Sequence, residues 1–305
     1  MTPLDRLLAT KHPFLNDGGL ETELIYHDKL DLPQFAAFVL MRDEDGRQAL
    51  RRYFNRYLDL AEAEGRGFLL DTPTWRANLS WAPKLGLGNA EIRAVNQQAV
   101  ELARGLRGAR SWADRILING SIGPAGDGYA PDQQLTPEAA YDLHAPQLES
   151  FAAAKVDLAT AATMTHVGEA IGLARRAQSL GLPIALSFTV ETDGKLPVGT
   201  LLADAIAAVD DATGGAPIYY GINCAHPTHF AGILQGDWLQ RIGLVRANAS
   251  RLSHAELDVA TELDDGDPEE FGTLHGELAR LLPNLRVIGG CCGTDTRHVA
   301  AAARA

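Results

Sequence analysis

The sequence predicts a (β/α)₈ barrel, formed as one domain by residues 1–305. Short apolar or β-branched runs recur eight times, and a longer segment with helical periodicity follows each of them. Strands that alternate with helices pair in parallel through right-handed crossovers. Eight such units in a chain of this length are typical of the closed barrel. The predicted strands are 13–17, 67–72, 115–119, 156–161, 183–189, 218–224, 243–247 and 284–290.

Helix signals fall between these runs. Residues 43–64 carry an apolar stripe with helical spacing. Thr136 followed by Pro137 predicts a helix that runs to residue 154, because Thr caps a helix and Pro suits its first turn. Another helix is predicted over 166–180, where Gly181 ends it. Further helices are predicted from Asp267 to just before Pro283 and over 299–305.

An open, doubly wound sheet is the alternative fold. It is disfavoured because no G-x-G-x-x-G follows a predicted strand and no G-x-x-x-x-G-K-[ST] occurs. No Ser/Gly/Pro-rich linker divides the chain, which favours one domain. The connection 23–43 is longer than average, and we expect it to cover the mouth of the barrel.

Composition and charge exclude several classes of protein. The 27 Lys and Arg residues face 39 Asp and Glu residues, a net charge of −12, so we expect no nucleic-acid or anionic-membrane partner. The apolar runs are far shorter than the ~20 residues of a membrane span, and residues 1–15 lack a secretory pattern. Three cysteines form an odd, sparse set, which argues against a disulfide framework and predicts a reducing, cytoplasmic location.

The chemistry of such barrels lies at the carboxyl ends of the strands. The first strand ends in Asp17-Gly18-Gly19, where glycines let backbone N–H groups approach a ligand carboxylate, although this triplet also forms ordinary turns. The second and third strands end in Asp71-Thr72-Pro73 and Asn119-Gly120-Ser121. These small polar residues suit the floor of a ligand site, but each alone is more simply an ordinary turn.

All three cysteines belong to predicted strand ends. Cys224 ends the sixth strand, and Cys291 and Cys292 follow the eighth. On neighbouring strand ends, three thiolates form a tetrahedral Zn²⁺ set that leaves a fourth position open, as in catalytic sites. The alternative is buried, unreactive cysteine, which suits one thiol better than three. We expect His226 and His229 to support the site or start a helix rather than bind metal.

The residues alone point to thiol alkylation. Zn²⁺ held by three thiolates is a poor Lewis acid for hydrolysis. It suits a fourth ligand that is itself a thiol, because coordination lowers the thiol pKa and holds the thiolate at neutral pH. That thiolate is a nucleophile, for which an electrophilic methyl group is a natural partner.

The sequence resembles the homocysteine S-methyltransferase family over about residues 13–300. The motifs that carry the resemblance are Asp17-Gly18-Gly19, Gly120-Ser121-Ile122-Gly123-Pro124, Gly221-Ile222-Asn223-Cys224 and Gly289-Gly290-Cys291-Cys292-Gly293-Thr294. The resemblance implies Zn²⁺ held by Cys224, Cys291 and Cys292, and methyl transfer to the zinc-bound thiolate of homocysteine, giving methionine. It also implies that the backbone at Asp17, Gly18 and Gly19 binds the amino-acid carboxylate. Asn223 would then shape the pocket beside the metal.

One departure from the family concerns the acceptor. Members that use homocysteine carry a Glu near the end of strand four that pairs with the amino group, and this chain has Ala162 there. Thr163 and Thr165 can hydrogen-bond an ammonium, but more weakly than a carboxylate does. Glu191 and Glu21 are candidate substitutes. The same chemistry on another thiol is therefore an alternative, and a non-catalytic barrel that binds zinc or thiols is a further one.

A second departure concerns the donor. Arg76 stands where the betaine-using branch carries an aromatic residue, which disfavours betaine, and the chain has no room for folate and cobalamin modules. The expected donor is a small sulfonium, S-methylmethionine before S-adenosylmethionine, because no adenine-binding motif is legible. Trp75, Phe35 and Phe38 can each face it by cation–π attraction, although core packing is the expected role of the two phenylalanines. The C-terminal assembly extension of the betaine branch is absent, so a monomer or weak homo-oligomer is expected.

Overall fold

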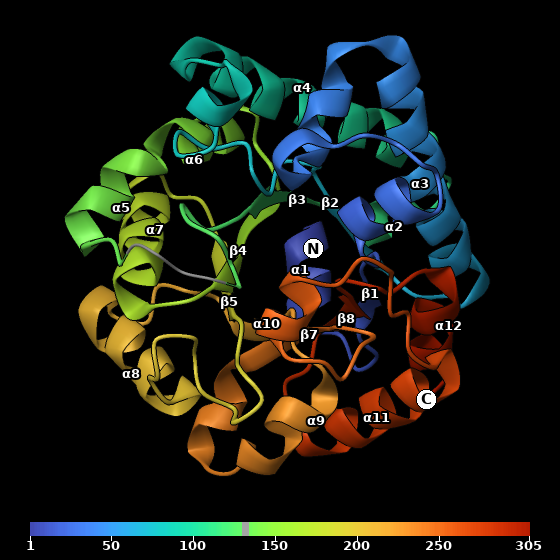
Figure 1. Ribbon diagram of the computed structural model, residues 1–305, viewed down its shortest axis with the longest axis vertical. Coiled ribbons are helices and arrows are strands. Elements are labelled where there is room, and N and C mark those ends of the chain that lie inside the picture. Colours follow the sequence, from blue (N-terminus) through green and yellow to red (C-terminus); the bar gives the residue numbers. More distant parts are fainter. Residues whose placement is uncertain (130–133) are drawn as a thin grey trace.

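Eight parallel strands close into a barrel in the order β1 to β8, with helices around it (Figure 1). The computed structural model describes residues 1–129 and 134–305. β1 pairs with β8, Phe14 beside Val287, so the sheet has no open edge. The predicted (β/α)₈ fold is thereby confirmed over the open sheet. The strands are β1 (Phe14–Leu15), β2 (Phe68–Asp71), β3 (Ile116–Ile122), β4 (Leu158–Met164), β5 (Ile184–Phe188), β6 (Tyr220–Asn223), β7 (Ile242–Ala247) and β8 (Val287–Gly290).

Side chains cap the starts of several helices, as in α3. In α3 the Asp43 side chain accepts a hydrogen bond from the Gly46 N–H (2.8 Å) and caps the helix. Tyr53 and Tyr57 belong to its buried stripe. The α-helices are α1 (Pro3–Leu8), α2 (Leu20–Tyr26), α3 (Glu44–Ala63), α4 (Asn89–Gly108), α5 (Pro137–Leu143), α6 (Ala145–Ala153), α7 (Val167–Ser179), α8 (Leu202–Thr213), α9 (Pro227–Phe230), α10 (His254–Asp258), α11 (Pro268–Leu281) and α12 (Thr296–Arg304).

One predicted helix is in fact two. The segment expected as a single helix over 136–154 divides into α5 and α6, which meet at His144. Pro146 lies in the first turn of α6 and has no N–H with which to continue the hydrogen bonds of α5. His144 is fully buried at this break, where its Nε2 lies 2.8 Å from the Glu169 carboxylate.

Two strands run further than the sequence predicts. β3 ends at Ile122, which pairs with Ala161 of β4, and β4 ends at Met164, which pairs with Phe188 of β5. A bulge between Ala161 and Met164 then interrupts the pairing of β4 with β5. Within it Thr163 has a φ of 63°, a left-handed conformation that β-branched residues rarely adopt. The bulge leaves both Ala162 and Thr163 on the cavity at the barrel mouth.

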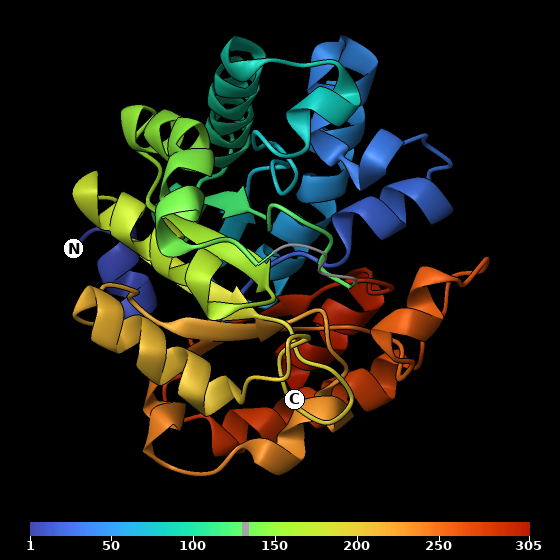
Figure 2. The ribbon, with the colours of Figure 1, turned by 60° about the vertical axis from the view of Figure 1, so that its left-hand side comes forward.

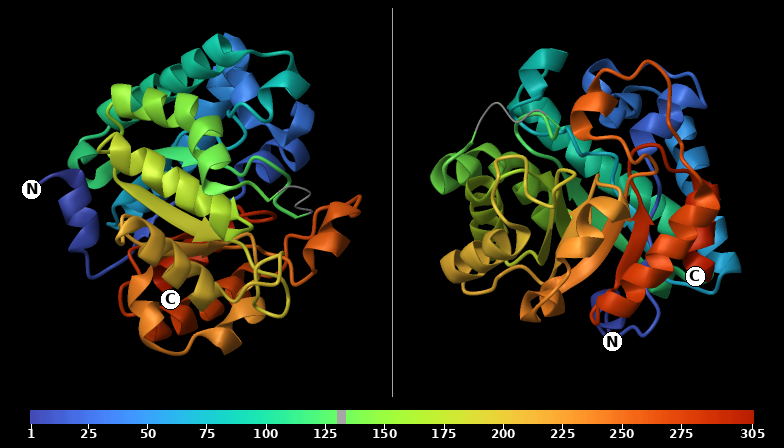
Figure 3. Two further views of the ribbon diagram at one scale, coloured as in Figure 1. Left: turned by 90° about the vertical axis from the view of Figure 1, so that its left-hand side faces the viewer. Right: turned by 60° about the horizontal axis from the view of Figure 1, so that its bottom comes forward.

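The two ends of the barrel differ in chemistry. At the amino-terminal end, Leu7 of α1 is fully buried and packs in an apolar layer with Phe14, Leu69 and Leu117. Figure 3 shows α1 at this end and the segment that carries α10 at the other. Polar side chains gather at the carboxyl end, where the candidate site lies.

The connection after β1 covers part of the mouth, as predicted. It contains α2 and two 3₁₀ turns, Pro33–Phe35 and Ala37–Arg42, and it lies at the same end of the barrel as α10 (Figure 2). Phe35 lines the mouth, which corrects its expected place in the core, whereas Phe38 is buried in the core as expected. None of the described helices is long and apolar enough to cross a membrane.

Candidate active site

Two adjoining cavities open at the carboxyl ends of the strands in the described part of the chain. The inner cavity lies among the ends of β1, β2, β4, β6, β7 and β8. The outer cavity, of about 340 Å³, is bounded by the loops after β3 and β7 and is large enough for a small ligand. The residues shared by both cavities are Thr22, Phe35, Trp75, Thr163, Cys224 and Cys292. Cys224 and Cys292 therefore border both cavities.

The barrel brings the three cysteines together. Cys224 directly follows β6, Cys291 and Cys292 directly follow β8, and their three sulfur atoms lie within 4.8 Å of one another. Cys224 and Cys291 are joined as a disulfide, with Cα atoms 5.4 Å apart, and Cys292 is free. The small, odd number of cysteines argues against a disulfide framework, and this single bond between two loops is not such a framework. Three thiolates become available to one metal ion only after this bond is reduced.

Asn223 and Thr163 hold the side of the cluster nearest β4. The Asn223 Nδ2 donates to Cys224 Sγ (3.2 Å) and to Thr163 Oγ1 (2.8 Å), while its Oδ1 accepts from the Thr163 N–H (2.9 Å). Thr163 Oγ1 itself lies 3.5 Å from Cys224 Sγ. The β4 bulge thus turns Thr163 toward the sulfur atom. Both residues line the inner cavity, where they were predicted to bind substrate.

A second set of contacts fixes the backbone of Cys224, whose φ of 55° is left-handed. His254 Nε2 donates to the Cys224 carbonyl (2.7 Å), and Asn248 Nδ2 donates to the same oxygen (3.1 Å). His254 Nδ1 lies 2.9 Å from the Glu191 carboxylate, and the Tyr129 ring stacks on the imidazole at 4.3 Å. Together these contacts hold the backbone of Cys224 in a strained conformation, as often happens at functional sites.

The predicted Asp17-Gly18-Gly19 turn follows β1 and lines the inner cavity. The Gly19 N–H donates to the Thr294 carbonyl (3.1 Å), so this amide is already used. A Cβ at Gly19 would lie 2.6 Å from the Cys291 carbonyl oxygen, and one at Gly18 would lie 2.8 Å from that of Thr294. The glycines therefore let the loops after β1 and β8 pack directly together. The amides of Asp17 and Gly18 have no acceptor among the described residues and remain available to a ligand.

Sequence reasoning missed Arg246 of β7, which is the centre of the polar network. Its Nη2 pairs with Asp17 Oδ1 (2.5 Å), its Nη1 with Asp71 Oδ2 (2.7 Å), and its Nε donates to the Gly290 carbonyl (3.0 Å). Asp71 also accepts from Asn119 Nδ2 (2.6 Å). A signal was present in the sequence, because a lone Arg within an apolar strand must find a partner when buried.

The carboxyl groups around Arg246 are strongly affected by burial. Burial raises the pKa of Asp17 and that of Asp71, and the guanidinium of Arg246 opposes both shifts. Burial likewise raises the pKa of Glu21 to about 7, although backbone N–H donors, Arg76 and Arg246 act against it. The inner cavity is thus rich in carboxyl groups and poor in cations.

The other residues that the sequence singled out are two histidines, one threonine and two glutamates. His226 caps α9, with Nδ1 2.8 Å from Thr228 Oγ1, and His229 Nε2 lies 2.9 Å from the Arg251 carbonyl. The group of described residues that could hold a metal consists of the three cysteines and contains neither histidine. Thr165 lies beside His166 (3.1 Å), away from both cavities. Of the two candidate carboxylates, Glu21 lines the inner cavity, whereas Glu191 faces His254.

The outer cavity combines aromatic and acidic side chains. Its aromatic residues include Trp75, shared with the inner cavity. Its acidic residues are Asp127, Asp258, Glu262 and Asp264. Arg76 is the basic residue in the described lining, and its guanidinium lies over the rings of Trp81 (3.6 Å) and Trp75 (4.8 Å) and pairs with Asp127 (3.5 Å).

Comparisons with known proteins agree with this geometry. The family model described as homocysteine S-methyltransferase matches residues 14–305. The homocysteine S-methyltransferase of Escherichia coli is 28% identical over 98% of this chain and 97% of its own, and the methionine synthase of Mycobacterium leprae is 26% identical over 82% of this chain and 20% of its own. The E. coli homocysteine methyltransferase MmuM superimposes with a TM-score of 0.76 in its oxidized form, at 26% identity over all of both chains, and with the same score in its metallated form, at 23% identity over 99% of both chains. The fold, the cavity at its mouth and the match over nearly its whole length together show that this chain is an enzyme of the homocysteine S-methyltransferase family.

Proposed function

We propose that this protein is a zinc-dependent S-methyltransferase that moves a methyl group from a small sulfonium, S-methylmethionine or S-adenosylmethionine, to the thiol of homocysteine, giving methionine. The observation that carries the proposal is the cluster of Cys224, Cys291 and Cys292 at the point where the two cavities meet. A thiol in the inner cavity and a methyl donor in the outer cavity would face each other there. Family membership supports the same reaction class.

The cysteine cluster fits a zinc ion. Three thiolates around Zn²⁺ at about 2.3 Å stand about 3.8 Å apart in a tetrahedron. The three sulfur atoms already lie within 4.8 Å of one another, so small side-chain movements suffice after the Cys224–Cys291 bond is reduced. When bound, the ion lowers the pKa of the acceptor thiol and supplies it as a thiolate at neutral pH.

Residues of this chain orient the acceptor. The amides of Asp17 and Gly18 are available to the amino-acid carboxylate, since among the described groups none accepts from them. Asn223 and Thr163 form the wall of the inner cavity beside Cys224 and restrict where the acceptor sulfur can lie. Holding the two reactants in contact provides most of the acceleration that a direct transfer needs.

The outer cavity favours a cationic donor. Four carboxylates line it against the single guanidinium of Arg76 in the described lining, and aromatic rings attract a sulfonium through cation–π contact. In the transfer, a lone pair of the acceptor sulfur forms the new S–CH₃ bond while the bond from the sulfonium sulfur to that methyl breaks. The electron pair of the broken bond stays on the donor, which leaves as a neutral thioether. The acceptor thiol loses its proton to solvent.

The test is methionine formation by the reduced, zinc-loaded protein supplied with homocysteine and S-methylmethionine or S-adenosylmethionine. We expect chelator-sensitive turnover, and the rate with each donor identifies the one used. Cys224→Ser should abolish both tight zinc binding and turnover. His229→Ala is the matched control, because His229 lies on the same connection but outside both cavities. Turnover that persists in protein shown to be free of metal contradicts the proposal.

Another thiol as acceptor is the second candidate, and Ala162 is the observation that favours it. Ala162 lines the inner cavity and offers no charge to an ammonium group. Under this alternative, the zinc-loaded protein methylates other small thiols from the same donors and leaves homocysteine unused. Protein that binds zinc but methylates no thiol from any sulfonium would instead indicate a non-catalytic barrel.

A further inference from the structure

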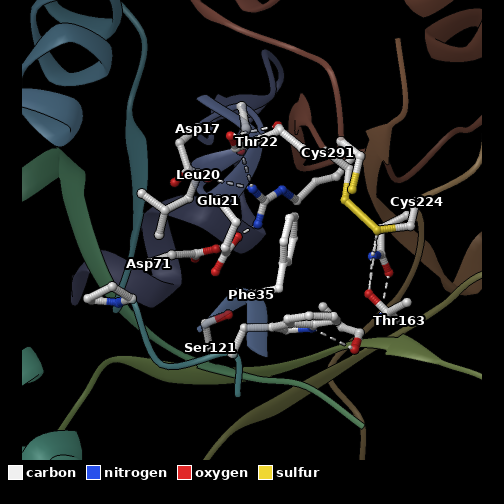
Figure 4. A pocket seen from close by; sticks show the side chains of 18 of the residues that line it. Asp17, Leu20, Glu21, Thr22, Phe35, Asp71, Ser121, Thr163, Cys224 and Cys291 are labelled. Atoms are coloured by element: carbon white, nitrogen blue, oxygen red, sulfur yellow. Dashed lines mark hydrogen bonds and ion pairs between the residues drawn. A yellow bond between two sulfur atoms is a disulfide. The ribbon is translucent and has the colours of Figure 1, made fainter. Parts of the chain in front are cut away.

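The inner cavity has two chemically different ends. The sulfur atoms of Cys224 and Cys291 lie at one side, and the side chains of Asp17, Glu21 and Asp71 gather at the other (Figure 4). A linear acceptor whose thiol reaches the cysteine cluster therefore places its far end among carboxyl groups. The charge at that end decides which class of thiol can bind.

Two of these three carboxylates already have partners. Asp17 and Asp71 share the guanidinium of Arg246 at 2.5 and 2.7 Å. Glu21 forms no ion pair with any of the described basic side chains, and Arg76 pairs with Asp127 instead. The acid end therefore carries excess negative charge, and Glu21 is the carboxylate left without a cation.

The position of Glu21 is fixed by its neighbours on α2. Glu23 accepts from the Tyr57 hydroxyl (2.7 Å) and pairs with Arg56, which anchors one side of the helix to α3. Thr22 Oγ1 accepts from the Gly293 N–H (3.2 Å), which ties the helix to the loop that carries Cys291 and Cys292. These contacts fix the distance from Glu21 to the cysteine cluster. A fixed distance is needed for the site to select acceptors of one chain length.

We infer that Glu21 binds the ammonium group of the acceptor and makes the inner cavity selective for thiols that carry an α-amino group over thiols that carry only a carboxylate. The inference rests on the proposed function for the acceptor's thiol end. An ammonium that donates a charge-assisted hydrogen bond to Glu21 gives this half-buried carboxylate the cation that it lacks among the described residues. A mercaptoalkanoate brings the same carboxylate to these carboxyl groups without an ammonium to compensate its charge, and it binds more weakly.

Calorimetric binding of two thiols to the reduced, zinc-loaded protein tests the inference without turnover. Homocysteine and 4-mercaptobutanoate have the same chain length and differ only in the amino group. We expect the wild type to prefer homocysteine by about ten- to a hundredfold, as one charge-assisted hydrogen bond provides. Glu21→Gln should abolish this preference, because it weakens the binding of homocysteine and leaves that of 4-mercaptobutanoate unchanged. Glu21→Asp, which retains a carboxylate, should keep part of the preference.

Glu138→Gln is the matched comparison, because Glu138 is an exposed glutamate of α5 that lies outside both cavities. It should keep the wild-type preference between the two thiols. The inference is overturned if Glu21→Gln retains the preference, if Glu138→Gln loses it, or if the wild type has none. Methyl transfer is assayed separately: absence of transfer with the binding preference intact refutes the proposed reaction and leaves the role of Glu21 standing.

Discussion

Arg246 shows at the scale of one residue how this barrel tolerates charge in its interior. The side chain is 14% exposed and contacts the loop after β1 as well as the ends of β2 and β8. Burial alone lowers the pKa of an arginine, but Asp17 and Asp71 outweigh it and the pKa of Arg246 is raised. Arg246 is therefore charged at every working pH and holds the strand ends around the inner cavity.

Replacing Arg246 by Met should destabilise the protein by about 3–5 kcal/mol, because two buried carboxylates lose their shared cation. Arg246→Lys should lose less stability but also fail to bridge both carboxylates, since an ammonium lacks the fork geometry. The measurement is urea unfolding followed by circular dichroism. Adding Asp71→Asn to Arg246→Met should recover part of the loss, and a Met variant as stable as the wild type would contradict this role.

At the scale of elements, the connection after β7 contributes most of the acidic lining of the outer cavity. Asp258 lies at the end of α10, and Glu262 and Asp264 follow it. Ser250 Oγ donates to Asp264 Oδ2 (2.5 Å), which fastens the connection near its start. The negative charge of this segment lies where a positively charged donor would enter.

Neutralising this segment with Asp258→Asn and Glu262→Gln should raise the KM for a sulfonium donor by about three- to tenfold, as exposed charges contribute modestly. The value of kcat and the KM for the thiol should not change. Steady-state kinetics at low and at high salt provide the measurement, and the effect should shrink at high salt because the charges are screened. A double variant on the exposed face of α5, Glu138→Gln and Asp142→Asn, is the control. An equal effect in that control would assign the change to net charge alone.

No local sequence pattern predicts the β4 bulge. A short run of apolar and β-branched residues predicts β4, but the register shift after Ala161 depends on how β4 meets β5. The bulge is what brings the Thr163 hydroxyl to Cys224, 61 residues further along the chain. Thr163 was named from its sequence position at the strand end, whereas its contact with the sulfur atom required the sheet.

At the scale of the whole molecule, acid sensitivity follows from histidines that folding keeps neutral. His275 of α11 is 2% exposed, and burial lowers its pKa to about 4, against the opposing hydrogen bond to the Phe271 carbonyl. The unfolded chain takes up a proton near pH 6.5, whereas the folded protein does so only near pH 4. The contribution of neutral His275 to the free energy of unfolding is therefore lost as the pH falls from about 6.5 to about 4.

His275→Gln should flatten this dependence and recover about 3 kcal/mol near pH 4 relative to the wild type, after any constant cost of the substitution is subtracted. Urea unfolding of chelator-treated protein between pH 7 and pH 4 is the measurement. The exposed His12, changed to Gln, is the control and should follow the wild-type curve. Parallel curves for His275→Gln and the wild type would show that another group carries the acid sensitivity.

The sequence by itself determined the eight strand–helix units, the mouth as the place of chemistry and the residues of the cysteine cluster, because periodicity, caps and strand-end motifs are local. The tertiary structure decided which groups meet. Cys224 and Cys291 are 67 residues apart and form a bond only because the barrel closes, and Arg246 finds Asp17 and Asp71 across three strand ends. It also separated Glu21, which lines the cavity, from Glu191, which does not. Such pairings depend on register and closure, which no window of sequence contains.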